Sequence, residues 1–353
     1  MGLRHVHMAE FAWVHLEPRE GEFHFDWLDQ AVALAEQNDL EIILCTPTAT
    51  PPVWVAQDYP QTLMVRANGR RVTHGSRAQR CVNTPAFDRL AEAIAAKLAQ
   101  RYGDHPRVIG WQLDNELGHY DNAPCYCPAC EAAFRRYLED RYGDIDHLNS
   151  AWAGDFWSQN YHNFDQIPLP NPEALPYLAN EHALLDFRRF FSNSLALFLE
   201  NQAALLRRHI RRDAWITHNF IAGDRFVHPR HVTRGLDTFT VTLYPVAGTF
   251  VPPPGSERFR LGDPMALAYH HDFSRGHIGR WGVMEQQPGQ VNWGPHNCRP
   301  YPGAVRLWLW TAIAHGAELL DTYRFRQPRG GCEQYHEGLL QLDGKTPSAG
   351  GHD

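Results

Sequence analysis

Two glutamates stand directly after apolar segments of strand length. Glu116 closes the segment 109–116, and Glu285 closes the segment 281–285. A carboxyl group at a strand end is partly desolvated, which raises its pKa toward that of a general acid unless a neighbour holds the charge. On strands that face each other across a barrel mouth, two such groups could lie ~5 Å apart, the separation that a retaining glycosidase needs. The alternative is that each glutamate belongs to a structural ion pair.

Four cysteines form the second candidate site. Cys125, Cys127 and Cys130 make a CxCxxC cluster, and Cys81 is a plausible fourth ligand. Four thiolates bind zinc tetrahedrally and leave no open position, so the predicted Zn²⁺ is structural. A chance cluster or one local disulfide is the alternative, and an intracellular chain has little use for a disulfide.

Other kinds of chemistry lack their sequence signatures. The chain has no HExxH zinc motif, no GxSxG elbow of serine hydrolases, and no glycine-rich nucleotide fingerprint after a predicted strand. Eleven tryptophans in 353 residues are typical of proteins that bind sugars.

Net charge and hydropathy limit the classes of partner that the chain can bind and predict its location in the cell. The formal charge of −7 argues against nucleic acid as a binding partner, because a phosphate backbone is held by positive charge. No apolar run of about 18 residues and no apolar leader occur, so we expect no membrane partner and a cytoplasmic protein.

The elements that would position these residues alternate between strand and helix. Apolar runs predict strands at 3–14, 40–45, 108–113, 215–220, 237–244, 280–285 and 318–323. Helical periodicity lies between several of them, at 25–37, 86–101, 129–142 and 180–211. This alternation predicts parallel strands with crossover helices. Without a nucleotide fingerprint, a (β/α)8 barrel is favoured over a doubly wound sheet, although seven strands are one too few.

The motifs around these sites resemble glycoside hydrolase family 42, the β-galactosidases of the retaining (β/α)8 superfamily. The likeness extends from residue 1 to about residue 344. It is carried by Glu10-Phe11-Ala12-Trp13, Thr46-Pro47-Thr48-Ala49-Thr50-Pro51-Pro52, His74-Gly75-Ser76-Arg77, Trp111-Gln112-Leu113-Asp114-Asn115-Glu116, Met284-Glu285-Gln286-Gln287-Pro288-Gly289 and Glu333-Gln334-Tyr335-His336.

The resemblance implies a role for each matching residue. Glu116 is the expected acid/base, and Glu285 is the expected nucleophile of a double displacement that releases terminal β-D-galactose. The residues expected around the galactosyl unit are Arg77, Asn115, Asn122, Trp157, Trp293, Glu333 and His336. The four cysteines match the metal cluster that many members carry. A galactoside is therefore the expected substrate.

The chain also departs from the family pattern. His7 stands where the family usually has an arginine, so a hydroxyl contact there is shorter and titratable. Family members open with a further strand and helix, and they continue into a closing helix, a trimerisation domain and a small β domain. The resemblance thus implies an incomplete barrel over residues 1–344 and no trimerisation domain, although relatives are homotrimers. The composition of residues 345–353 predicts a frayed tail.

Three other functions remain open at this point. The chain could be an impaired remnant that binds galactosides without hydrolysis, or an α-L-arabinopyranosidase, whose substrate lacks only the exocyclic hydroxymethyl group of galactose. A zinc-dependent hydrolase is the third alternative, and the closed shell of four thiolates argues against it.

Overall fold

Eight short parallel strands form the centre of the chain in the computed structural model, which describes residues 2–118, 124–221, 227–248 and 252–353. The strands are β1 (His5–Met8), β2 (Glu41–Cys45), β3 (Val108–Gln112), β4 (Trp215–Thr217), β5 (Asn219–Ile221), β6 (Phe239–Leu243), β7 (Trp281–Gln286) and β8 (Leu319–Thr322). They pair in the orders β1-β2-β3-β4 and β5-β6-β7-β8, with every ladder parallel.

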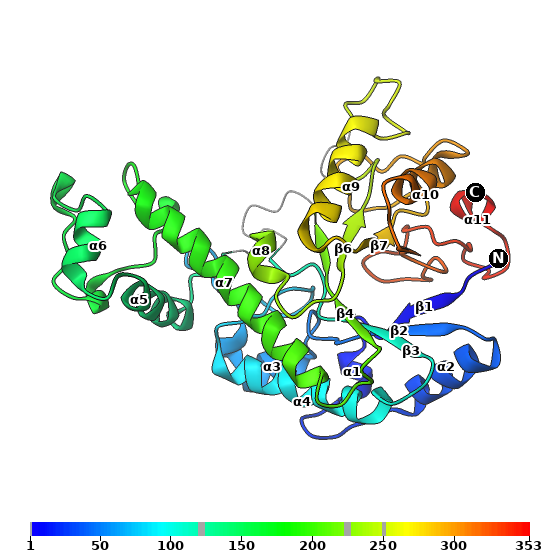
Figure 1. Cartoon of the computed structure of the whole chain (residues 1–353), viewed down its shortest axis with the longest axis horizontal. Helices are drawn as coiled ribbons and strands as arrows, with labels where there is room; N and C mark the ends of the chain where they lie inside the picture. The colour runs from blue at the N-terminus through cyan, green and yellow to red at the C-terminus, as the bar shows by residue number, and fades with distance from the viewer. Residues whose placement is uncertain (1, 119–123, 222–226, 249–251) are drawn as a thin grey trace.

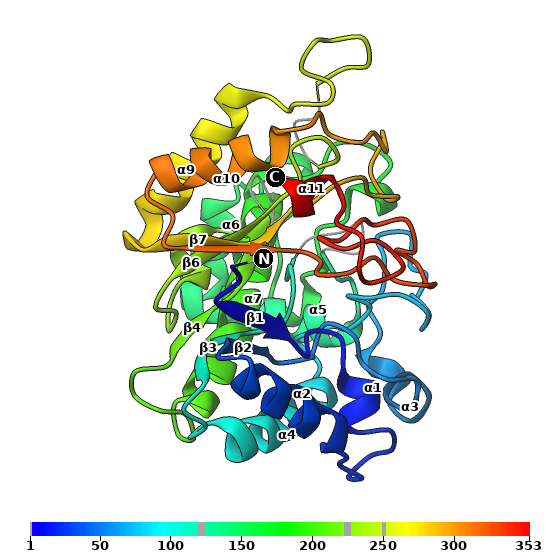
Figure 2. The ribbon, with the colours of Figure 1, turned by 90° about the vertical axis from the view of Figure 1, so that its right-hand side faces the viewer.

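The two sheets are parts of one curved wall. Strands β4 and β5 belong to the same chain segment and are separated only by His218. The eight strands therefore correspond to the seven segments predicted from sequence, and the predicted TIM-barrel fold is confirmed. Within the described residues no ladder joins β8 to β1, although His5 Nε2 and Asp321 Oδ2 approach to 3.8 Å there. Figure 2 looks onto this side of the molecule.

Helices cover the outside of the strands. They are α1 (Trp13–Leu16), α2 (Asp26–Gln37), α3 (Val53–Asp58), α4 (Pro85–Tyr102), α5 (Pro128–Tyr142), α6 (Ile145–Ala151), α7 (Glu181–Leu206), α8 (Pro229–Val232), α9 (Pro264–Ile278), α10 (Ala304–Ala314) and α11 (Ala349–His352), with 3-10 turns at Pro60–Thr62, Phe156–Ser158, Phe164–Gln166 and Pro172–Ala174. Figure 2 shows α2 and α4 below β1 to β4, and α9 and α10 on the side of β6 and β7. None of the helices in the described ranges is long and apolar enough to cross a membrane.

Apolar side chains at helical spacing fix this covering layer. On α4, Phe87, Leu90, Ile94 and Leu98 are almost fully buried, which follows the i, i+3, i+4 pattern of a one-sided helix. Trp111 on β3 is fully buried in the same cluster. The predicted helices at 25–37, 86–101, 129–142 and 180–211 correspond to α2, α4, α5 and α7.

The C-terminal tail differs from its expected frayed state. Residues 349–352 form α11, whose first turn is capped by Ser348. The Asp353 carboxylate accepts hydrogen bonds from the backbone N–H groups of Gly303 and Val305 at the start of α10. A carboxylate at a helix N-terminus is favoured by the helix dipole, and this contact orders the tail.

A side lobe projects from the barrel. It comprises α5, α6, the first half of α7 and the connecting segment 152–180, and it extends to the left in Figure 1. The lobe has its own core, in which the fully or almost fully buried side chains are Phe134, Leu138, Leu148, Trp152, Ile167, Phe187 and Phe190.

Asp186 on α7 is the polar centre of this lobe. Its buried carboxylate accepts hydrogen bonds from the Tyr142 hydroxyl at 2.6 Å and the Trp152 indole N–H at 3.0 Å. Arg141 and Arg189 form ion pairs with it at 3.4 and 3.2 Å. One carboxylate thus connects α5, α7 and the chain after α6.

We expect Asp186→Ala to lower the free energy of unfolding by about 2–4 kcal/mol, because the buried Trp152 indole N–H and the half-buried Tyr142 hydroxyl lose their acceptor. Denaturant unfolding followed by circular dichroism measures this loss. The control is Glu22→Ala, which removes only an exposed ion pair with Arg19 and should leave stability almost unchanged. Equal stabilities of the two variants would contradict the role given to Asp186.

Candidate active site

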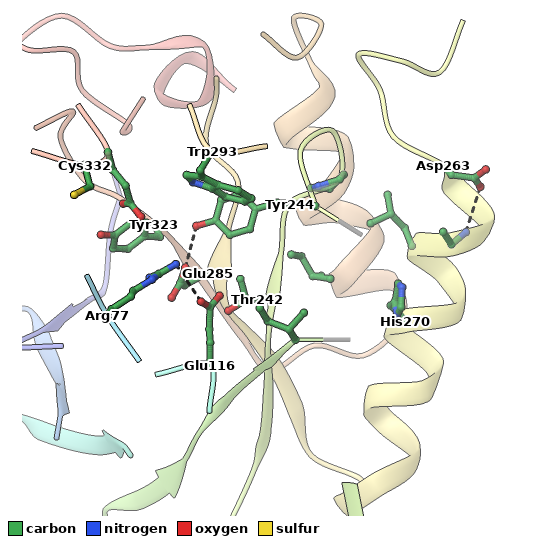
Figure 3. A pocket seen from close by; sticks show the side chains of 17 residues that line it. Arg77, Glu116, Thr242, Tyr244, Asp263, His270, Glu285, Trp293, Tyr323 and Cys332 are labelled. Atoms are coloured by element: carbon green, nitrogen blue, oxygen red, sulfur yellow. Dashed lines mark hydrogen bonds and ion pairs between the residues drawn. The ribbon is translucent and has the colours of Figure 1, made fainter. Parts of the chain in front are cut away.

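A cavity of about 430 Å³ opens at the carboxyl ends of the strands and contains both predicted glutamates. Figure 3 shows Glu116 and Glu285 directed into this space from two sides, with Arg77 and Tyr323 on one flank and Tyr244 and Trp293 above. The strand-end rule that selected the two glutamates therefore brings them to one site.

Glu116 is presented by a tight turn after β3. Asp114 and Glu116 both have positive φ, at 50° and 45°, a strained conformation for residues other than glycine. The buried Asp114 carboxylate forms an ion pair with Arg80 and accepts hydrogen bonds from the Thr48 hydroxyl at 2.6 Å and the Asn115 N–H at 2.7 Å. These contacts hold the turn. The Glu116 carboxylate itself lies 3.3 Å from the Arg77 guanidinium.

Glu285 lies on β7 and is 3% exposed. Burial raises its pKa well above the usual range, and the carboxylates of Glu10 and Glu116 add to this effect. Arg77 and a hydrogen bond from the Tyr244 hydroxyl to Glu285 Oε2, at 2.9 Å, act in the opposite direction. The protonation state of Glu285 is therefore set by a balance among its neighbours.

Glu10 is a third carboxyl group near this site, after β1. Burial raises its pKa to about 8, although the hydrogen bond from Gln112 Nε2 to its Oε1, at 2.9 Å, opposes the shift. Glu10 Oε1 also lies 2.5 Å from the side-chain amide of Asn115. The Glu10 carboxyl group is therefore buried against the side-chain amides of Gln112 and Asn115.

Several residues predicted as sugar ligands are at the site. Arg77, Trp293 and Glu333 line the cavity with the two glutamates, and Asn115 is buried beside Glu116. His336 lies behind this wall: its Nδ1 accepts from the Trp293 indole N–H at 3.3 Å, and its Nε2 lies 2.9 Å from the Tyr323 carbonyl oxygen. In this arrangement His336 orients Trp293.

Three other predicted ligands are placed elsewhere or not described. Trp157 is 56% exposed in the side lobe, where its ring lies near Phe156 and Tyr177. His7 is on β1, close to Glu10 and Cys45 and outside the cavity lining, and burial lowers its pKa to about 4. It is therefore neutral near pH 7. Asn122 lies outside the described residues.

Sequence reasoning missed three polar residues of the site. Asn219 begins β5, Tyr244 follows β6, and Glu10 follows β1. Asn219 and Tyr244 lie near the carboxyl ends of the predicted strands 215–220 and 237–244, so the rule that selected the two glutamates, applied to amides and phenols, would have found them. Glu10 lies inside the predicted strand 3–14, and only the observed end of β1 at Met8 places it after a strand.

The four cysteines of the predicted metal site come together beside the barrel. Their sulfur atoms lie within 4.8 Å of one another, and Cys81 Sγ is 3.3 Å from Cys130 Sγ and 3.5 Å from Cys127 Sγ. Zn–S bonds of about 2.3 Å in a tetrahedron place sulfur atoms about 3.8 Å apart. The backbone N–H of Val65 donates to Cys125 Sγ, and the side-chain amide of Asn83 donates to Cys130 Sγ. The four residues therefore fit a tetrahedral metal ion.

A parallel barrel with two carboxyl groups in a cavity at its strand ends is the arrangement found in TIM-barrel glycoside hydrolases. The sequence profile of glycoside hydrolase family 42, described as beta-galactosidase, matches residues 1–353. The chain therefore belongs to glycoside hydrolase family 42.

Individual relatives agree with this assignment. A beta-galactosidase of Thermus thermophilus is 43% identical over 347 residues, 97% of this chain and 53% of that protein. A beta-galactosidase of Halorubrum lacusprofundi is 41% identical, over 99% of this chain and 50% of that protein. The crystal structure of a beta-galactosidase from Marinomonas ef1 superposes with a TM-score of 0.95 at 39% identity, over 99% of this chain and 54% of that one. The chain spans about half the length of the curated relatives it matches.

Proposed function

We propose that this chain is the catalytic barrel of an exo-acting, retaining β-galactosidase that removes terminal non-reducing β-D-galactosyl residues. The observation that carries this proposal is the presence in one cavity of Glu116, from the turn after β3, and Glu285, near the end of β7. The names of the relatives support galactose as the sugar.

In the proposed reaction, the ionised Glu285 attacks the anomeric carbon of the galactosyl group, and the bond from that carbon to the leaving oxygen breaks. Glu116 gives its proton to the leaving oxygen. The now ionised Glu116 then takes a proton from water, which attacks the same carbon and displaces Glu285. Two inversions give β-galactose, and both carboxyl groups return to their starting states. Arg77, 3.3 Å from Glu116, stabilises the glutamate anion between the two steps.

The first test is hydrolysis of nitrophenyl β-D-galactoside by the purified chain, beside nitrophenyl α-L-arabinopyranoside, with size-exclusion chromatography of the same sample. Faster turnover of the galactoside, with β-galactose as the first anomer seen by NMR, is expected. Faster turnover of the arabinopyranoside would favour the second candidate. A folded chain that binds galactose without hydrolysis would overturn the proposed activity.

We further propose that Cys81, Cys125, Cys127 and Cys130 hold a structural Zn²⁺ ion. The support is the tetrahedral fit of the four buried sulfurs. When bound, zinc would supply only cross-linking, because four thiolates leave no position for water or substrate. We also propose a cytoplasmic location, since none of the seven cysteines forms a disulfide.

The acidic limb of the pH profile follows from the surroundings of Glu285. Because burial and two neighbouring carboxylates raise the pKa of this nucleophile, we expect kcat/KM to fall with decreasing pH well above about pH 4.3, the usual glutamate value. Tyr244→Phe removes a hydrogen bond that lowers this pKa, so its limb should move to higher pH. Rates measured from pH 4 to 9 test both statements. An unshifted limb in Tyr244→Phe would show that the limb does not report Glu285.

A further inference from the structure

We infer that Asn219, at the point where the two sheets meet, is a positioning residue that fixes Glu116 and Glu285 relative to each other. This inference rests on the proposed function, because it assigns the two glutamates their roles. Asn219 is fully buried and begins β5, directly after His218. It does not line the cavity, so it acts through the two glutamates and not on the sugar.

One amide connects the two glutamates. Asn219 Oδ1 accepts a hydrogen bond from the backbone N–H of Glu116 at 3.1 Å, and Asn219 Nδ2 donates to Glu285 Oε1 at 2.9 Å. The side chain of Asn115 lies 2.7 Å from the same amide. Because a backbone N–H can only donate, the oxygen of Asn219 must face Glu116. Its NH₂ group then faces Glu285, where a donor favours the ionised form of that carboxyl group.

The turn before Glu116 needs such a contact. Glu116 has a φ of 45°, a strained conformation for a residue other than glycine, which persists only where the surroundings hold it. The hydrogen bond from the Glu116 backbone N–H to Asn219 Oδ1 is one restraint on this conformation. The strain therefore makes the position of Glu116 sensitive to the amide.

His218 supplies a second restraint on the same turn. Its Nδ1 lies 2.6 Å from the Leu113 carbonyl oxygen, and its Nε2 accepts from the Leu117 N–H at 3.1 Å. This pattern requires a neutral ring with the proton on Nδ1. Two consecutive residues thus have separate tasks: His218 closes the turn across Leu113 and Leu117, and Asn219 connects it to the nucleophile.

The decisive variant is Asn219→Asp, which keeps an oxygen for the Glu116 N–H but places a second oxygen, in place of NH₂, against Glu285. On nitrophenyl β-D-galactoside we expect kcat to fall about 100-fold, with KM changed less than about threefold. We also expect the acidic limb of kcat/KM to rise by about one pH unit, because Glu285 loses a donor and gains an acidic neighbour. Asn219→Ala adds no charge and should shift the acidic limb of kcat/KM in the same direction. This second variant keeps the inference testable if Asn219→Asp does not fold.

A matched control is Asn149→Asp in the side lobe, which loses an amide donor to the Tyr161 carbonyl oxygen. The acidic limb of the kcat/KM profile of Asn149→Asp should lie at the same pH as that of the unaltered chain. A lower kcat with an unshifted limb in both Asn219 variants would mean that Asn219 only stabilises the fold, and would overturn the inference. Failure of the proposed function is distinct, because the unaltered chain itself would then not turn over the galactoside.

Discussion

Replacement of Glu285 by glutamine should abolish turnover of nitrophenyl β-D-galactoside, with kcat reduced about 10⁴-fold or more. The amide has nearly the same shape as the carboxyl group, so the barrel should still fold. Tyr244 can still donate to the amide oxygen, and the buried volume is unchanged. What is lost is the anionic oxygen of the proposed nucleophile. The measurement is the initial rate of nitrophenol release, with circular dichroism to verify folding.

A buried glutamate outside the site provides the control. Glu17 is 2% exposed, similar to Glu285, and accepts from the Trp13 indole N–H at 2.8 Å. Glu17→Gln keeps an acceptor there and should retain turnover. If Glu285→Gln hydrolyses the galactoside at the rate of the unaltered chain, Glu285 is not the nucleophile. If both variants are inactive, general disruption of the barrel explains the loss.

The second large effect is expected on stability. Cys127→Ser should remove one equivalent of zinc and lower the thermal midpoint by at least about 5 °C, because metal binding contributes directly to folding. The cluster joins Cys81, which precedes α4, to the chain that leads into α5, and its Cys125 sulfur accepts from Val65 N–H. Loss of the ion would release three segments of chain at once.

Metal analysis and thermal unfolding, each with and without a chelator, measure this effect. Cys298→Ser is the control, since Cys298 is a half-buried thiol outside the cluster. It should keep the metal and nearly all of the stability. Purified chain that contains no metal, and whose midpoint is the same in Cys127→Ser, would refute the zinc site.

Most of the barrel could be predicted from sequence because strands β2 to β7 are largely buried on both faces and have apolar sequences. Helices α9 and α10 could not. On α9 the buried positions include His270, His271 and Ser274, so the inward face is not apolar. On α10 apolar residues occur on all sides, with Trp310 63% exposed, so no helical period is visible.

The site could be predicted where its reactive side chains lie at or just beyond the ends of strands. Glu285 lies near the end of β7 and Glu116 in the turn after β3, and spacing alone indicated the cysteine cluster. The placement of Trp157 was not predictable, because it depends on how the side lobe packs and not on a strand register. The hydrogen bonds of Asn219 were equally hidden, since they join residues more than 60 positions apart in the sequence.

Helix α7 belongs to two cores at once. Its first half contributes Phe187 and Phe190 to the lobe, and its second half contributes Leu195, Phe198 and Leu199 to the barrel. A helix of 26 residues is about 39 Å long and behaves as one stiff rod. The lobe is therefore mechanically continuous with the barrel wall. Helix α7 packs against α4. A displacement of the tip of the lobe would therefore be transmitted through α7 to α4 in the barrel wall.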